Sequence, residues 1–234
     1  MDLDRASTYI NALYAKTGLN QEEYVANTEY EEYEPILDAD VSRMLGILVR
    51  LARPQKILEI GTSIGYSTSS MTRACAEYGG QILTVDNDEE VVSHAIKNFE
   101  RLGIAGNIEV RIGNALEIVP NLQETFDFIF QDVGDKGLYA TLFDDCVRLL
   151  NPGGLFVAED SLFPLMDQEW KEEEPGEGEP CGETIEAEDW EEDEEGDPFS
   201  DSLNQFNEMV ANNPLLESTI LSIGDGLTIA LKIK

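Results

Sequence analysis

Three carboxylates stand where two predicted strands end, in a pattern that could bind a metal ion. Asp132 follows the apolar run 126–131, while Glu159 and Asp160 follow the run 154–158. Neighbouring parallel strands end at one edge of a sheet, so we expect these side chains to converge. Crowded like charges call for a cation, and an all-oxygen ligand set suits magnesium, calcium or manganese. The alternative interpretation is that Asp132 and Asp160 only cap helices.

Lys136 lies four residues after Asp132 and could reach the same edge. A lysine beside an acceptor hydroxyl can act as a general base where a nearby cation lowers its pKa. As an exposed loop lysine it would have no such role. His94, the only histidine, lies in a predicted helix away from these strand ends, and we assign it no catalytic role.

A glycine turn lies upstream, where residues 57–67 read I-L-E-I-G-T-S-I-G-Y-S. The run predicts a buried strand that turns sharply into a helix. Ser63 and Tyr66 occupy two glycine positions of the dinucleotide fingerprint, and no Gly-Lys-Ser/Thr of a phosphate loop follows. A cofactor without phosphates, such as S-adenosylmethionine, fits better. The alternative is a tight connection inside some other α/β domain.

Two more strand ends could contact such a cofactor. Asp86 ends a predicted strand and could accept hydrogen bonds from both hydroxyls of a ribose. It could instead be a helix N-cap, a role open also to Asn87 or Asp88. Residues 113–115 could pass close to an adenine ring, begin a helix, or do both.

The elements that must position these residues alternate along the chain. We expect strands at 56–60, 81–86, 107–112, 126–131 and 154–158, with helices at 66–78, 89–102, 114–120 and 138–150. Such alternation predicts an α/β fold with a mainly parallel sheet and helices on both faces. Helices are also expected at 5–17, 21–33, 38–51 and 200–212. The chain should close on an antiparallel hairpin, 217–223 and 227–233, which makes seven strands.

The composition limits the classes of molecule that this chain is expected to bind. The net charge of -33 opposes binding to nucleic acid or an anionic membrane and favours a small-molecule substrate. No apolar run resembles a signal peptide or a membrane span, so we expect a cytoplasmic protein. Cys75, Cys146 and Cys181 lack metal-ligand spacing and are expected as free thiols, the first two buried in helices.

An acidic tract at 167–198 interrupts the pattern. It has too little apolar surface to offset its ordering entropy, so we expect a disordered insertion. Trp170, Trp190 and Phe199 leave a second hypothesis, in which part of the tract folds over the substrate as a lid.

Taken together, these pieces resemble the cation-dependent S-adenosylmethionine O-methyltransferases, the family of catechol and caffeoyl-CoA O-methyltransferases and their bacterial relatives. The match runs from about residue 35 to the C-terminus and rests on the order of six segments. They are L-E-I-G-T-S-I-G-Y-S, T-V-D-N-D, I-E-V-R-I-G-N-A-L-E, F-D-F-I-F-Q-D-V-G-D-K-G-L-Y, L-L-N-P-G-G-L-F-V-A-E-D and I-G-D-G-L-T-I-A.

The resemblance implies a Rossmann-like class I methyltransferase fold and a role for each matched residue. The cofactor-binding residues would be Glu59, Gly61, Thr62, Ser63, Gly65, Ser67, Asp86, Ala115 and Asp132. Asp132, Glu159 and Asp160 would hold the metal, and Lys136 with Asp132 would be catalytic. The family usually has Asp-Asn where this chain has Glu159-Asp160. The interval from Asp132 to Lys136 is one residue longer in this chain than in the family.

The leading hypothesis is therefore methyl transfer to a hydroxyl of a small, catechol-like substrate. Its alternatives are a tRNA hydroxyuridine O-methyltransferase, which the acidic charge disfavours, and a non-catalytic cofactor-binding module that recruits a basic partner through the acidic tract. A nicotinamide dehydrogenase is disfavoured by the glycine spacing. We expect an N-terminal helical segment, 1–52, capping a methyltransferase domain, 53–234. The family also suggests a homodimer formed through the N-terminal helices.

Overall fold

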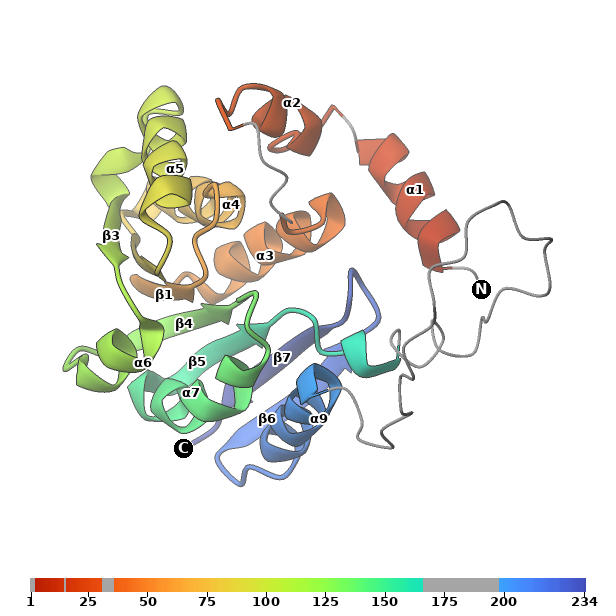
Figure 1. Ribbon diagram of the computed structural model, residues 1–234, viewed down its shortest axis with the longest axis vertical. Helices are drawn as coiled ribbons and strands as arrows, with labels where there is room; N and C mark the ends of the chain where they lie inside the picture. The colour runs from red at the N-terminus through yellow and green to blue at the C-terminus, as the bar shows by residue number, and fades with distance from the viewer. Residues whose placement is uncertain (1–2, 15, 31–35, 166–197) are drawn as a thin grey trace, which may run out of the picture.

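The computed structural model describes residues 3–14, 16–30, 36–165 and 198–234, and these form a twisted sheet between two layers of helices (Figure 1). The strands are β1 (Lys56–Ile60), β2 (Gln81–Asp86), β3 (Ile108–Ile112), β4 (Phe126–Gln131), β5 (Leu150–Ala158), β6 (Leu216–Leu221) and β7 (Leu227–Lys232). Their order in the sheet is β3-β2-β1-β4-β5-β7-β6. The first five pair in parallel and β7 runs antiparallel to both of its neighbours. The predicted α/β fold with its closing hairpin is confirmed.

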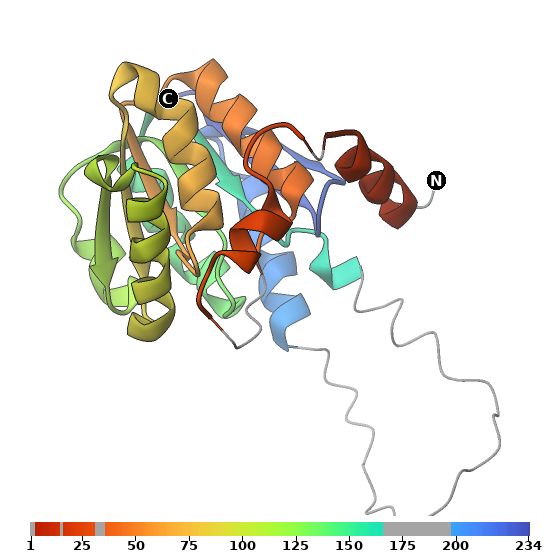
Figure 2. The same cartoon turned by 90° about the horizontal axis from the view of Figure 1, so that it is seen from above.

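Helices cover both faces of this sheet. They are α1 (Leu3–Tyr14), α2 (Gln21–Ala26), α3 (Ala39–Ala52), α4 (Tyr66–Cys75), α5 (Glu89–Arg101), α6 (Ala115–Ile118), α7 (Gly137–Leu149) and α9 (Pro198–Ala211). Figure 1 shows α3, α4 and α5 on one side of the sheet and α6, α7 and α9 on the other. Seen from above, α1 lies at the margin of the molecule (Figure 2), where Arg43 of α3 donates to Asn11 at 2.5 Å.

Each face of the sheet has its own apolar core. Leu45 of α3 and Phe130 of β4 belong to the core under α3 and α4. On the opposite face, Phe143 of α7 meets Phe206 of α9 edge to face, with ring centroids 5.8 Å apart. Central parallel strands are buried on both sides, which explains their nearly continuous apolar runs. Cys75 and Cys146 are buried free thiols, as predicted.

Several elements differ from their predicted bounds, and the first two helices and the fifth strand differ by three residues or more at one end. The helix predicted at 21–33 ends at Ala26, because the side chains of Asn27 and Thr28 donate to the carbonyls of Glu23 and Tyr24 and compete with the helix backbone. The first helix ends at Tyr14 rather than at residue 17.

The fifth strand begins at Leu150 rather than at residue 154, because residues 151–154 bulge out while Leu150 still pairs with Phe126. The acidic tract falls almost wholly outside the described residues, which resume at residue 198. The disordered-insertion and lid hypotheses therefore concern residues outside the described structure. Among the described helices, none is long and apolar enough to cross a membrane.

Lys232 joins strand β7 to the end of α7. Its Nζ donates to the carbonyls of Val147 and Leu150 at 2.7 and 2.6 Å, in a partly buried position. These carbonyls lie at the C-terminal end of the helix, where a positive charge is also favoured by the helix dipole.

Replacing this lysine with an apolar side chain should leave both carbonyls without their charged donor. We expect Lys232→Met to lower the free energy of unfolding by about 1–3 kcal/mol. Urea unfolding followed by circular dichroism would measure it, with Lys234→Met at the exposed chain end as the matched control. Equal midpoints for the two variants would contradict this role.

Candidate active site

A cavity of about 640 Å³ opens at the carboxyl edge of the sheet. Its walls come from the turn after β1, the end of β2, the segment after β3, the ends of β4 and β5, and the tip of the β6–β7 hairpin. This is the edge at which open α/β sheets bind ligands. Of the residues predicted to bind a cofactor, seven line the cavity: Gly61, Thr62, Ser63, Ser67, Asp86, Ala115 and Asp132.

The turn after β1 depends on the absence of a side chain at Gly61. This residue has φ +102°, and an added Cβ would lie 1.7 Å from the Asp132 carbonyl oxygen. Its amide donates to Val85 O at 2.9 Å, while the Asp132 amide donates to Ile60 O at 2.9 Å. The backbone at the end of β1 is therefore pressed against the ends of both neighbouring strands.

Asp86 holds this turn from the opposite side. Its Oδ2 accepts the amides of Thr62 and Ser63 at 2.8 and 2.9 Å, and its Oδ1 accepts the amide of Asp88 at 3.0 Å. The N-cap of α5 is Asp88, whose carboxylate accepts the amides of Glu90 and Val91. Asp86 is thus not the helix cap, and it faces the cavity with its carboxylate aligned by the turn.

Ser63 offers an unused polar atom in the same turn. It adopts a left-handed conformation with φ +46°, and its buried Oγ has no hydrogen-bond partner among the described residues. A buried polar group without a partner is costly, so this hydroxyl is suited to a bond with a ligand.

Glu59 and Gly65 are the two predicted cofactor residues that do not line the cavity. Glu59 is fully buried behind the turn, where its carboxylate accepts the hydroxyls of Ser67 and Thr84 at 2.6 Å each and that of Thr68. Gly65 instead permits close packing, since an added Cβ would lie 2.4 Å from the Phe99 ring. Burial raises the pKa of Glu59 to about 7. Glu59 can act on a ligand only through Ser67, which does line the cavity.

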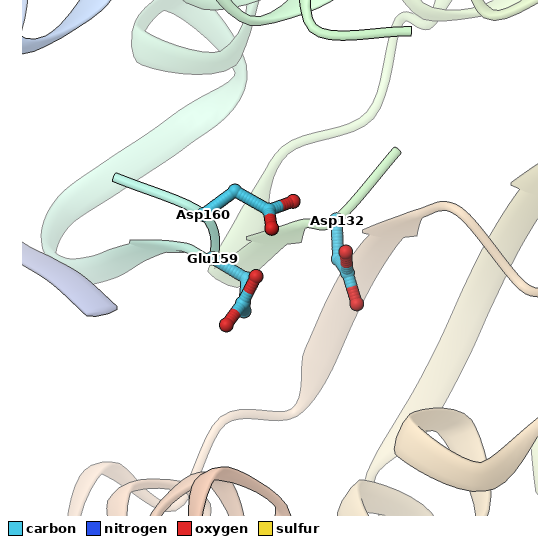
Figure 3. A group of neighbouring side chains, drawn as sticks. All are labelled: Asp132, Glu159 and Asp160. Atoms are coloured by element: carbon cyan, nitrogen blue, oxygen red, sulfur yellow. The ribbon is translucent and has the colours of Figure 1, made fainter. Parts of the chain in front are cut away.

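We call Asp132, Glu159 and Asp160 the carboxylate triad. One oxygen from each lies within 4.8 Å of the others, and Figure 3 shows the three side chains gathered at the ends of β4 and β5. Burial, followed by the charge of Asp160, raises the pKa of Asp132 to about 7. Burial and the neighbouring Asp160 raise the pKa of Glu159 to about 11. Crowding of acids in a partly dry site disfavours their charged forms, as expected for ligands that a cation would stabilise.

Lys136 lies beside the triad and lines the same cavity. Its Nζ forms an ion pair with Asp160 and donates to Val133 O at 3.1 Å. Tyr139 donates its hydroxyl to the same Asp160 oxygen at 3.1 Å. Lys136 is thereby held at the cavity wall by the segment after β4 and by Asp160 after β5.

The comparisons with known proteins agree with this geometry. The family model described as O-methyltransferase matches residues 18–233. The chain belongs to the O-methyltransferase family. This methyltransferase is 30% identical over 200 residues to a catechol O-methyltransferase of Niastella koreensis, covering 81% of this chain and 78% of that one. It is 28% identical over 201 residues to caffeoyl-CoA O-methyltransferase 5 of Nicotiana tabacum, covering 83% and 76%.

Solved structures share the fold of the methyltransferase. The O-methyltransferase TomG of Streptomyces achromogenes, in complex with SAM, superposes with a TM-score of 0.77 at 22% identity over 100% of both chains. The Bacillus cereus O-methyltransferase, in complex with SAH, gives a TM-score of 0.71 at 24% identity and covers 96% of this chain and 97% of that one.

Two cavity residues of the methyltransferase were not singled out by sequence reasoning. Asp38 lies just before α3, and Asp225 lies at the tip of the β6–β7 hairpin. Asp225 lies between two glycines, a pattern that by itself indicates only a turn. Asp38 carried no local signal, since an aspartate before a helix is usually an N-cap.

A methyl group at residue 61 should disrupt the contact between β1 and β4. We expect Gly61→Ala to lower the free energy of unfolding of the methyltransferase by about 2 kcal/mol or more, through steric overlap and left-handed strain. Chemical denaturation would measure it. In Gly106→Ala, the matched control, an added Cβ would meet no described atom within 4 Å, so the control should retain its stability.

The buried Glu59 should make stability depend on pH. Its pKa is about 7 in the folded chain against an ordinary value of 4.5, so the folded state holds more protons between these values. Stability should therefore fall as pH rises through this window, by up to about 3 kcal/mol. Thermal unfolding from pH 5 to 8 should show a smaller decline in Glu59→Gln. Parallel curves for the two proteins would show that Glu59 does not titrate in this window.

Proposed function

We propose that this O-methyltransferase transfers the methyl group of S-adenosylmethionine to a hydroxyl of a small, catechol-like acceptor, with a divalent cation held by the carboxylate triad. One observation carries the proposal: the triad and the glycine turn border the same cavity, joined by the contact of Gly61 with Asp132. The relatives named for catechol and caffeoyl-CoA support a hydroxylated aromatic acceptor.

The turn side of the cavity fits the methyl donor. Gly61 and Gly113 keep the backbone free of side chains there, and the orphaned Ser63 hydroxyl supplies a bond for a polar ligand. We assign Asp86 to the ribose hydroxyls, since its oxygens are already fixed in direction by the turn amides. Ala115 lines the wall where a flat adenine ring would pass.

The triad fits a hard divalent cation. Its donors are oxygens only and they lie close together. Burial, followed by the neighbouring Asp160, raises the pKa of Asp132 and of Glu159, so a cation at this position would stabilise their charged forms. Magnesium, calcium and manganese all suit this donor set. When bound, such an ion would polarise an acceptor hydroxyl and help to orient it.

The residues of the chain then perform the remaining steps. The acceptor oxygen attacks the methyl carbon in line with the carbon–sulfur bond, which breaks with its electron pair left on sulfur. We assign the hydroxyl proton to Lys136 Nζ, held beside Asp160, which would accept it after a bound cation has displaced the lysine's own proton to solvent. Asp132 and the turn fix donor and acceptor relative to each other, so that positioning supplies much of the rate.

Three further features remain proposals. The 1–52 segment would cap the methyltransferase domain, a homodimer would form through it, and the protein would act in the cytoplasm. Exposed apolar side chains on α1, such as Tyr9 and Leu13, provide a surface on which a second copy could pack.

The triad can be tested by a near-isosteric substitution. We expect Asp132→Asn to lower kcat/KM for methyl transfer to ethylcatechol by about a hundredfold or more, because one charged ligand is lost. The reaction should require added magnesium and stop with EDTA. Asp144→Asn on the exposed face of α7 removes the same charge as a control. Full activity of the wild type in EDTA would rule out a role for the cation in the reaction. It would leave cofactor binding, which calorimetry measures separately, unaffected.

A further inference from the structure

The cavity is far more negative than the proposed reaction requires. Eight carboxylates line it, whereas Lys136 is the only basic residue among its described lining residues. A divalent cation and Lys136 together match the charge of the triad, and S-adenosylmethionine adds one net positive charge. The lining carboxylates still outnumber these positive charges. An acceptor that enters this cavity therefore meets a negative potential.

Five of the lining carboxylates lie outside the triad. Asp86 and Asp88 bind backbone amides of the turn and of α5, and Asp135 accepts the amide of Gly137. These three hold backbone amides in place. Asp38 and Asp225 also line the cavity, and they approach the triad from opposite ends of the sequence.

Asp38 occupies the N-cap position of α3 without capping it. Its side chain makes no capping hydrogen bond, although its backbone carbonyl accepts the Ser42 amide. The side chain lies instead toward the hairpin tip. An added Cβ on Gly224 would lie 3.7 Å from Asp38 Oδ2 and 3.0 Å from Glu159 Oε1. The Asp38 carboxylate and Glu159 of the triad therefore both lie close to the backbone of Gly224.

Asp225 stands next to that glycine. Its backbone amide donates to Glu159 Oε1 at 3.2 Å, which ties the hairpin tip to the triad. Asp225 and Glu159 both line the cavity, so this hydrogen bond places the hairpin tip beside the triad. A cation placed among these carboxylates would relieve their mutual repulsion.

We propose that Asp38 and Asp225 are specificity-determining residues that favour an acceptor bearing a positive charge, such as a catechol with an ammonium group, over an anionic acceptor. This inference rests on the proposed function, because it assigns the acceptor class of the same cavity. A CoA thioester, with its phosphates, belongs to the disfavoured class. The rim position of Asp38 and Asp225 limits the effect through solvent and salt screening.

Three catechols of similar size and different charge test the proposal. Dopamine is cationic at pH 7.5, ethylcatechol is neutral and dihydrocaffeate is anionic. Their dissociation constants are measured by calorimetry on the full chain with S-adenosylhomocysteine and magnesium, and kcat/KM is measured with S-adenosylmethionine. We expect dopamine to bind about tenfold or more tightly than dihydrocaffeate at low salt, with ethylcatechol between them.

The double variant Asp38→Asn with Asp225→Asn should reduce this ratio by about fivefold or more, and added salt should reduce it in the wild type. Asp144→Asn carries one charge change outside the cavity and should keep the wild-type ratio. The proposal is overturned if dopamine fails to bind, if dihydrocaffeate binds as tightly, or if the double variant keeps the ratio. Selective binding without methyl transfer would refute the proposed function alone, whereas methyl transfer without charge preference would refute only this inference.

Discussion

The backbone contact between Gly61 and Asp132 determines the geometry of the whole cavity. The turn and the end of β4 approach so closely that no β-carbon fits between them. Backbone hydrogen bonds from Gly61 to β2 and from Asp132 to β1 fix the same edge. The proposed donor side, around Asp86, and the proposed acceptor side, around the triad, are therefore parts of one wall. Their relative positions depend on backbone packing rather than on side-chain rotamers.

The same wall concentrates acidic groups at a cost to the folded state. Glu59, Asp132 and Glu159 all have raised pKa values, because burial and mutual repulsion disfavour their charged forms. The chain offsets part of this cost internally, through three hydroxyls on Glu59 and through Lys136 and Tyr139 on Asp160. We expect cationic ligands to relieve the remainder, which would link stability to ligand binding in this protein.

We infer that the acceptor specificity of this cavity is set at its rim. The turn and the triad lie at strand ends of the central sheet. Asp38 and Asp225 come from segments nearer the two ends of the chain. Such peripheral segments can vary without disturbing the strands, so relatives named for different acceptors can share one core. On the proposed function, this acidic rim would disfavour an acceptor that carries phosphates.

The arrangement of strands and the meeting of the triad could be predicted from sequence, because both follow from local patterns. Apolar runs placed β1, β2 and β4 at their observed bounds, and strand ends that are neighbours in a parallel sheet must bring Asp132, Glu159 and Asp160 together. The early end of α2 and the bulge in β5 were missed. They depend on side-chain competition for carbonyls and on pairing register, which periodicity does not report.

The direction in which each carboxylate points could be determined only from the folded chain. Glu59 and Asp86 both stand at strand ends in the sequence, yet packing buries the first behind the turn and turns the second toward it. Asp38 and Asp225 have no shared motif, and they meet only because the β6–β7 hairpin folds back beside the start of α3. Local sequence patterns predict where polar groups leave the core, whereas long-range packing sets which of them face one another.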